Sequence, residues 1–76
     1  RQNATFSFGQ LEQGNFFQLE PDQEKPNAWI QVISGSLTVG DCNLDRADGL
    51  GIENIDQLLT LEADQNCEFF IFRLAD

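Results

Sequence analysis

Histidine is absent from this sequence, and its absence excludes several large classes of site. None of the 76 residues is His. Without an imidazole, this segment has no Ser-His-Asp or Cys-His arrangement, no usual general base near neutral pH and no His-based zinc or iron site. The sequence therefore predicts no catalytic, cofactor-binding or metal-binding residue here, and the segment by itself is not expected to be an enzyme.

Basic residues are also scarce. The chain has four Lys and Arg against 13 Asp and Glu, which gives a formal net charge of -9. Nucleic acids and anionic membrane surfaces are polyanions that bind through Lys and Arg, so neither is an expected partner. We interpret the acidity as a solvated surface that keeps the protein soluble.

Long apolar runs and a dense set of cysteines are missing as well. No stretch approaches the roughly 20 apolar residues needed to cross a bilayer, and none has the pattern of a signal peptide. The two cysteines, Cys42 and Cys67, are too few for a disulfide scaffold and too far apart in sequence for a CxxC motif. We expect two free thiols, with a disulfide as the alternative; free thiols are typical of a reducing compartment, so we expect a cytoplasmic location.

The residues that are present indicate one small folded domain. Apolar residues make up 41% of the chain and include seven Phe, which is too hydrophobic for a disordered segment despite the charge. The chain opens at Arg1 without a Met, and Phe6 and Phe8 already alternate with polar residues as in a strand. We therefore expect residues 1–76 to form a single domain cut from a longer chain.

Short apolar runs separated by turn residues predict an all-β fold. Both prolines fall in a charged loop, Glu20–Asn27, and Gly40 with Asp41 is a two-residue hairpin signal. A single helical turn within Asn54–Leu61 is the weaker alternative. The pattern is typical of a small barrel or double-sheet sandwich. The expected strands are Thr5–Leu11, Asn15–Leu19, Ala28–Ser34, Leu37–Val39, Cys42–Leu44, Leu50–Glu53, Leu58–Ala63 and Glu68–Leu74.

Two of these strands are apolar on both faces. In Trp29–Ile33 and Phe69–Leu74 apolar residues occupy odd and even positions, and side chains alternate between the two sides of a strand. Such strands need cover on both sides. Without a neighbouring domain, an apolar patch of several hundred Å² is expected on the surface.

Glycines mark further expected features of the backbone. Gly35 forms a corner between two strands, and Gly49 and Gly51 flank Leu50. The flanking glycines suggest a bend or a backbone with positive φ.

Acidic residues gather in two places, and neither has the pattern of a site. The range Asp41–Asp48 holds three Asp and one Asn, but an EF-hand counted from Asp41 would need Gly and Glu where the chain has Arg46 and Ile52. We interpret these residues as turn formers that bond their own backbone, with a weak calcium site as the alternative.

Asp22 and Glu24 are the second acidic group, and they could pair for acid and base chemistry. They lie beside Lys25 in the most solvated loop, whereas catalytic pairs need burial to separate their pKa values. A solvated charge run is the preferred interpretation.

Two polar residues, Gln31 and Arg73, interrupt apolar strands. If buried, each needs hydrogen-bond partners. Together with Trp29 they indicate either an outer face half covered by a neighbouring domain or a ligand pocket.

The run AWIQVISGSLTVGDCNLDRADGLG, from Ala28 to Gly51, with the closing strand FFIFRL, resembles the C-terminal cupin domain of pirin-like proteins, including bacterial pirin-type quercetinases. The resemblance implies a small cupin-type, jelly-roll antiparallel β-barrel of about eight short strands. The matching positions are Trp29-Ile30-Gln31-Val32 with Gly35, Asp48-Gly49-Leu50, and Glu68 to Leu74.

The metal-ligand pattern of cupins is not matched. Metal-binding cupins have two His and a Glu before the first glycine corner and a further His on a later strand. If Gly35 is that corner, the Glu position falls on Ala28, the two His positions fall in Asp22–Glu24, and the later His falls near Ile52. None of these residues is a ligand of the right type, so the resemblance implies a barrel without metal.

The resemblance also implies a partner. In pirin-like proteins the metal and the chemistry belong to the N-terminal cupin, and the C-terminal cupin packs against it. The expected function is a non-catalytic, metal-free domain that supports the catalytic N-terminal cupin of the same chain through Phe6, Phe8 or Trp29. The parent would be a quercetin 2,3-dioxygenase-like oxygenase or a pirin-type regulator, and a homo-oligomer is left open.

A different function is the alternative. A free-standing β-barrel could bind a small apolar ligand inside the barrel. The residues around such a ligand would be Ala28, Ile30, Val32 and Ile52.

Overall fold

The computed structural model describes residues 4–75, which contain eight β-strands and no helix. Within that range there is accordingly no helix long and apolar enough to cross a membrane. Every predicted strand is present, with bounds that agree to within one residue, so the all-β prediction is confirmed. The strands are β1 (Ala4–Leu11), β2 (Phe16–Leu19), β3 (Asn27–Ser34), β4 (Leu37–Val39), β5 (Cys42–Leu44), β6 (Gly49–Ile52), β7 (Leu59–Ala63) and β8 (Cys67–Leu74).

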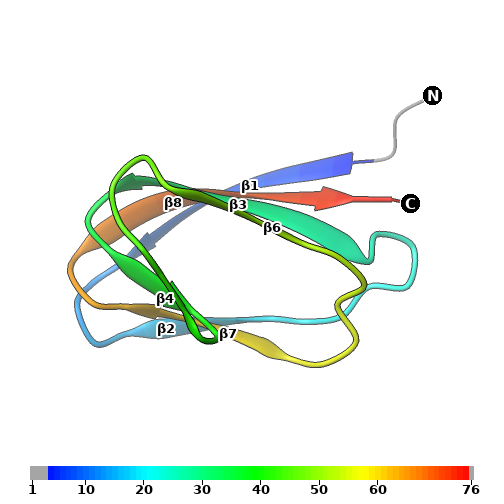
Figure 1. Ribbon diagram of the computed structural model, residues 1–76, viewed down its shortest axis with the longest axis horizontal. Coiled ribbons are helices and arrows are strands. Elements are labelled where there is room, and N and C mark those ends of the chain that lie inside the picture. Colours follow the sequence, from blue (N-terminus) through cyan, green and yellow to red (C-terminus); the bar gives the residue numbers. More distant parts are fainter. Residues whose placement is uncertain (1–3, 76) are drawn as a thin grey trace.

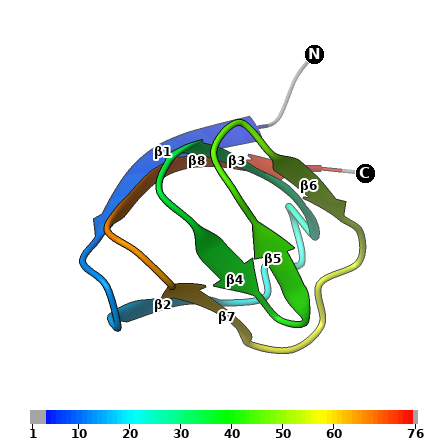
Figure 2. The same cartoon turned by 60° about the vertical axis from the view of Figure 1, so that its left-hand side comes forward.

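The strands form two four-stranded sheets that lie face to face (Figures 1 and 2). Sheet A has the order β1-β8-β3-β6, and sheet B has the order β2-β7-β4-β5. All pairings are antiparallel. Consecutive strands alternate between the sheets except for β4 and β5, which form the predicted hairpin with Val39 opposite Cys42. This is the jelly-roll arrangement expected from the sequence.

The core lies between the sheets, and the adjacent strands β3 and β8 supply its centre. Ile30 lies opposite Ile71 and Val32 opposite Phe69, and all four side chains are buried. Full burial of a side chain of this size contributes about 1.5–3 kcal/mol. Further buried apolar residues from both sheets and one loop complete the core: Leu19, Ala28, Leu37, Val39, Leu44, Ile55, Leu61, Ala63 and Cys67.

Gly35 forms the corner between β3 and β4, as the sequence predicted. Its φ is +76°, and a Cβ at this position would collide with the backbone carbonyl of Asn66. Any other residue would therefore be strained and would also displace the turn between β7 and β8.

Gly49 and Gly51 have a role that differs from the expectation. Of the two alternatives, a bend or a positive φ, neither is found: both residues lie in the strand β6, paired with β3, and neither has a positive φ. The indole of Trp29 lies across them instead: a Cβ on Gly51 would come 3.2 Å from Trp29 Cε3, and one on Gly49 would collide with the ring. The glycines thus let Trp29 cover the outer side of β6.

The helical alternative within Asn54–Leu61 is also wrong. The chain from 53 to 58 is a loop, and Ile55 anchors it by placing its side chain in the core. The Ile55 amide donates a hydrogen bond to the Pro26 carbonyl at 2.8 Å. This contact ties the loop to the chain just before β3.

Gly9 is predicted to be essential for core packing. Phe69 lies against the backbone of β1, so a Cβ on Gly9 would come 2.6 Å from Phe69 Cζ. Phe69 is 2% exposed, so a shift of its ring would disturb the packing of the core around it. We expect Gly9→Ala to lower the free energy of unfolding by about 1–3 kcal/mol, the usual cost of overpacking, as measured by urea denaturation.

Ser7→Ala is the control, since Ser7 is exposed and lies two residues away on the same face of β1. Its free energy of unfolding should stay within about 0.5 kcal/mol of the parent value. Equal effects of the two substitutions would contradict the packing of Phe69 on Gly9.

Candidate functional site

Two positions that the sequence resemblance assigns to metal ligands in metal-binding cupins lie side by side in the structure. Ala28 pairs with Ile52 across β3 and β6, Ala28 is buried, and Ile52 packs against the core. Both side chains are hydrocarbon and offer no donor atom. Within residues 4–75, no three His, Cys, Asp or Glu side chains come together in a group that could hold a metal ion.

The third position, the loop Asp22–Glu24, is a turn organised by Asp22. The Asp22 Oδ1 atom accepts hydrogen bonds from the amides of Glu24 at 2.9 Å and Lys25 at 3.2 Å. The Glu24 amide is the main cause that holds the pKa of Asp22 below its ordinary value of 3.8, because it stabilises the charged carboxylate. Asp22 therefore stabilises a solvated turn, in agreement with the sequence interpretation.

The acidic group in the range Asp41–Asp48 also forms hydrogen bonds with the backbone and with neighbouring side chains. The Asp48 carboxylate accepts a hydrogen bond from the Asp45 amide at 2.9 Å. Thr38 Oγ1 donates to Asn43 Oδ1 at 2.6 Å. These contacts match the interpretation of the group as turn formers.

Gln31 joins the outer face of β3 to the turn before β6. Its Nε2 donates to the carbonyls of Ala47 at 3.0 Å and Asp48 at 3.1 Å, and its Oε1 accepts from Trp29 Nε1 at 3.2 Å. The amide is thus satisfied within the domain. It needs neither a ligand nor a neighbouring domain to complete its hydrogen bonds.

Arg73 has a similar role at the other end of sheet A. Its Nη1 donates to the Glu20 carbonyl at 2.8 Å and its Nη2 to the Lys25 carbonyl at 2.7 Å. The guanidinium therefore fastens the loop between β2 and β3 to the end of β8. The two polar residues hold loops, an explanation that the sequence interpretation did not include.

The residues expected around an apolar ligand lie in the packed core. Ala28, Ile30 and Val32 have exposed fractions of 2%, 0% and 1%. They contact side chains of the opposite sheet within one core cluster. This packing favours a scaffold over a ligand-binding barrel.

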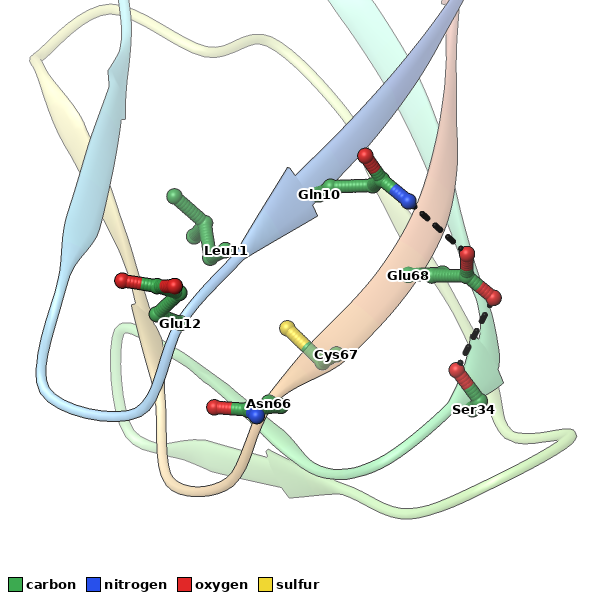
Figure 3. Close-up of a pocket in the computed structure, with 7 residues that line it drawn as sticks. All are labelled: Gln10, Leu11, Glu12, Ser34, Asn66, Cys67 and Glu68. Atoms are coloured by element: carbon green, nitrogen blue, oxygen red, sulfur yellow. Dashed lines mark hydrogen bonds between the residues drawn. The ribbon is translucent and has the colours of Figure 1, made fainter.

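A surface hollow of about 490 Å³ opens where β1 ends and β8 begins (Figure 3). The Glu68 carboxylate beside it accepts hydrogen bonds from Gln10 Nε2 at 3.0 Å and Ser34 Oγ at 3.2 Å. Glu12 and Glu68 lie on opposite sides of the Cys67 thiol in this view. Because these groups do not converge on one point, the hollow has no evident chemistry.

The outer side of sheet A carries the most unusual feature of the surface, which we call the aromatic face. Phe6 and Phe8 on β1 lie against Phe70 and Phe72 on β8, with ring centroids 4.7 Å apart for Phe6–Phe70, 4.8 Å for Phe6–Phe72 and 5.5 Å for Phe8–Phe70. Trp29 on β3 extends the face to β6. Phe6, Phe8 and Trp29 are 56%, 52% and 41% exposed, so this apolar surface is open to solvent.

Charged residues avoid the aromatic face. β1 has no charged residue, and β8 has two, Glu68 and Arg73. Glu68 lies at the end of the face, and Arg73 bonds the β2–β3 loop. In a chain of net charge -9, an uncharged aromatic surface of this kind is typical of an interface.

Residues 1–74 match the family model described as the quercetinase C-terminal cupin domain. The chain belongs to this family. This confirms the resemblance seen in the sequence, and it explains why the strand pattern and the glycine corner fit so closely.

Two comparisons with individual proteins agree with this assignment. The chain is 41% identical over 46 residues to a Pasteurella multocida (strain Pm70) protein named "Putative quercetin 2,3-dioxygenase", over 60% of this chain and 19% of the relative. The chain thus aligns with about a fifth of that relative's length. The crystal structure of a cupin-2 domain containing protein from Shewanella frigidimarina NCIMB 400 superposes with a TM-score of 0.70 at 18% identity, covering 93% of this chain and 70% of that one. This likeness shows the cupin fold.

Arg73 is predicted to stabilise the domain through its two carbonyl contacts. Arg73→Met keeps a long side chain but leaves the carbonyls of Glu20 and Lys25 without their donor. We expect a loss of about 1.5–3 kcal/mol in the free energy of unfolding, measured by urea denaturation. Arg46→Met, which removes the same charge from an exposed turn residue, should change it by less than about 0.5 kcal/mol. A similar cost for both variants would contradict the role of Arg73.

The two cysteines are predicted to differ in reactivity. Both are free; Cys42 is exposed and Cys67 is buried, and burial raises the pKa of the Cys67 thiol above its ordinary value of 9.0. With a disulfide reagent at neutral pH, Cys42 should react at least about 10-fold faster than Cys67. The variant Cys42→Ser should show no fast phase until denaturant is added.

The raised pKa of Cys67 also predicts how stability changes in alkali. The contribution of the buried neutral thiol to the free energy of unfolding is fully present below pH 9.0, the ordinary pKa of a thiol. This contribution is lost as the pH rises through the higher pKa of the folded state. A fast phase in Cys42→Ser would show that Cys67 is accessible and would contradict both expectations.

Proposed function

We propose that this domain is a non-catalytic, metal-free cupin that packs against a catalytic N-terminal cupin of the same polypeptide and supports it. Residues 1–76 would then be the C-terminal domain of a two-domain protein. The name of the Pasteurella multocida relative supports a quercetin 2,3-dioxygenase-like oxygenase as the activity of that longer protein. Two unpaired thiols are compatible with the cytoplasm, which we propose as its compartment.

The aromatic face is the observation that carries this proposal. Its side chains form one contiguous patch across β1, β8 and β3, and aromatic residues are enriched at the centres of protein interfaces. Because Phe6 and Phe8 are more than half exposed, they contribute little of their area to the core of this domain. A second domain covering them would bury apolar area that a chain of this size cannot bury alone.

The interior of the barrel supports the non-catalytic half of the proposal. Ala28 and Ile52 fill the positions of metal ligands with hydrocarbon, and the core around them is closely packed. A reactive ion would have no ligand there. The contribution of this domain to the parent is therefore stability and orientation, while the reaction takes place in the other cupin.

The double variant Phe6→Ser with Phe8→Ser tests the proposal. In the two-domain protein it should lower the free energy of unfolding of this domain by at least about 2 kcal/mol more than in the isolated 76-residue chain, because interface anchors are lost only in the larger protein. Urea denaturation of both proteins measures the difference. Activity of the parent should fall together with stability.

The double variant Phe16→Ser with Leu58→Ser is the matched control. These residues are 62% and 56% exposed, and these fractions are similar to those of Phe6 and Phe8. Unlike Phe6 and Phe8, however, they lie outside sheet A. The two substitutions should lower the free energy of unfolding by the same amount in the isolated chain and in the two-domain protein. If the Phe6 and Phe8 variant also costs the same in both, the aromatic face is not the interface and the proposal fails.

A further inference from the structure

β1 differs from the other edge strands in length and composition. It has eight residues, whereas the edge strands β2, β5 and β6 have four, three and four. In the described part of the chain β1 pairs on one side with β8, and no strand pairs with its other side. Every second N–H and C=O pair along β1 therefore points away from the sheet.

β1 also lacks the features that keep exposed edges from pairing. Its sequence, ATFSFGQL, contains no Lys, no other charged residue and no Pro. Natural proteins usually protect long edge strands with such residues or with a covering segment. An unprotected edge of this length indicates that another segment covers it in the working protein.

An apolar hollow of about 250 Å³ lies directly beside this edge, between β1 and β2. Leu11, Phe17, Phe69 and Ile71 line it. Phe17 lies opposite the buried Leu61 and on the same side of β2 as the buried Leu19, yet it is 44% exposed. Phe17 is therefore not fully covered on this side, where β1 and β2 are the edge strands of the two sheets (Figure 2).

The edge and the hollow together fit one kind of occupant. A strand added to β1 would point alternate side chains into the hollow, onto Phe17 and Phe69. The other side chains would lie on the outer side, next to Phe6 and Phe8, and so extend the aromatic face. Every second residue of such a strand lies on its inner face, and these residues need large apolar side chains.

A second copy of this chain is a poor candidate for that strand. If β1 paired with the β1 of another copy, the inner positions would be filled by Thr5, Ser7, Gly9 and Leu11. Only Leu11 is large and apolar, so these four residues would fill an apolar hollow of about 250 Å³ poorly.

We propose that β1 receives an extended segment from the N-terminal part of the same polypeptide, which adds to sheet A as a fifth strand and closes the hollow with alternating Leu-, Ile-, Val- or Phe-like side chains. This proposal rests on the proposed function and specifies how the two parts join. Main-chain hydrogen bonds supply the pairing, and the hollow selects the side chains.

Residue-resolved amide hydrogen exchange tests the added strand. In the two-domain protein, alternate amides of Ala4–Leu11 that exchange freely in the isolated chain should become protected by at least about 10-fold. Packing on the aromatic face alone would leave these amides unprotected. Protection that grows with the concentration of the isolated chain would show that a second copy is the occupant and would overturn the proposal.

The variant Ser7→Lys tests the same edge by substitution. Ser7 is exposed beside the hollow, so Lys places a charge where the inner side chains of the added strand would lie. It should remove the protection of the β1 amides in the two-domain protein. Thr60→Lys, at an exposed position of β7 in sheet B, is the control with the same charge change and should leave the protection intact.

The outcomes separate the two proposals. If the β1 amides gain no protection but Phe6→Ser with Phe8→Ser still uncouples the domains, the added strand is wrong and the proposed function stands. If neither effect is seen, both are wrong. Protection that Ser7→Lys abolishes and Thr60→Lys leaves unchanged supports the added strand.

Discussion

The pairing of β3 with β8 is the interaction on which the rest of this structure depends. Both strands are apolar on both sides, so their inward residues, such as Ile30 and Phe69, form the centre of the core. Their outward residues, Trp29, Phe70 and Phe72, form part of the aromatic face. β1 and β6 attach to the outer edges of this pair, so its register sets the positions of the remaining strands of sheet A.

The two sides of sheet A have different consequences for function. The inner side is filled by side chains that meet those of sheet B, among them Ala28 and Ile52, the residues that the sequence resemblance places at metal-ligand positions. The outer side leaves Phe6 and Phe8 open to solvent. A domain of 76 residues buries only about 60% of its unfolded surface, so a surface of this kind gains more from a partner than it would in a larger protein.

The polar residues of the strands explain how so small a core holds its loops. Gln31 and Arg73 reach the carbonyls of two separate loops, and Ile55 inserts a third into the core. The hydrogen bonds of Gln31 and Arg73 give partners to loop carbonyls. Those of Arg73 come from a charged donor and are therefore stronger than neutral ones. The loops at both ends of sheet A are therefore held by side chains from the sheet itself.

By itself the sequence determined the strands, the hairpin at Gly40, the Gly35 corner and the apolar residues at Ala28 and Ile52, because alternation and turn residues are local signals. That pattern predicts a small barrel or double-sheet sandwich, and the cupin family was predictable from the resemblance of Ala28–Gly51 and the closing strand to known sequences. The tertiary structure alone decided the roles of Gln31 and Arg73, which bond carbonyls 16 and 53 residues away in the chain. It likewise decided that Trp29 lies over Gly49 and Gly51 and that β1 is an open edge beside Phe17. Such contacts depend on which strands become neighbours, and a local pattern of residues does not contain that information.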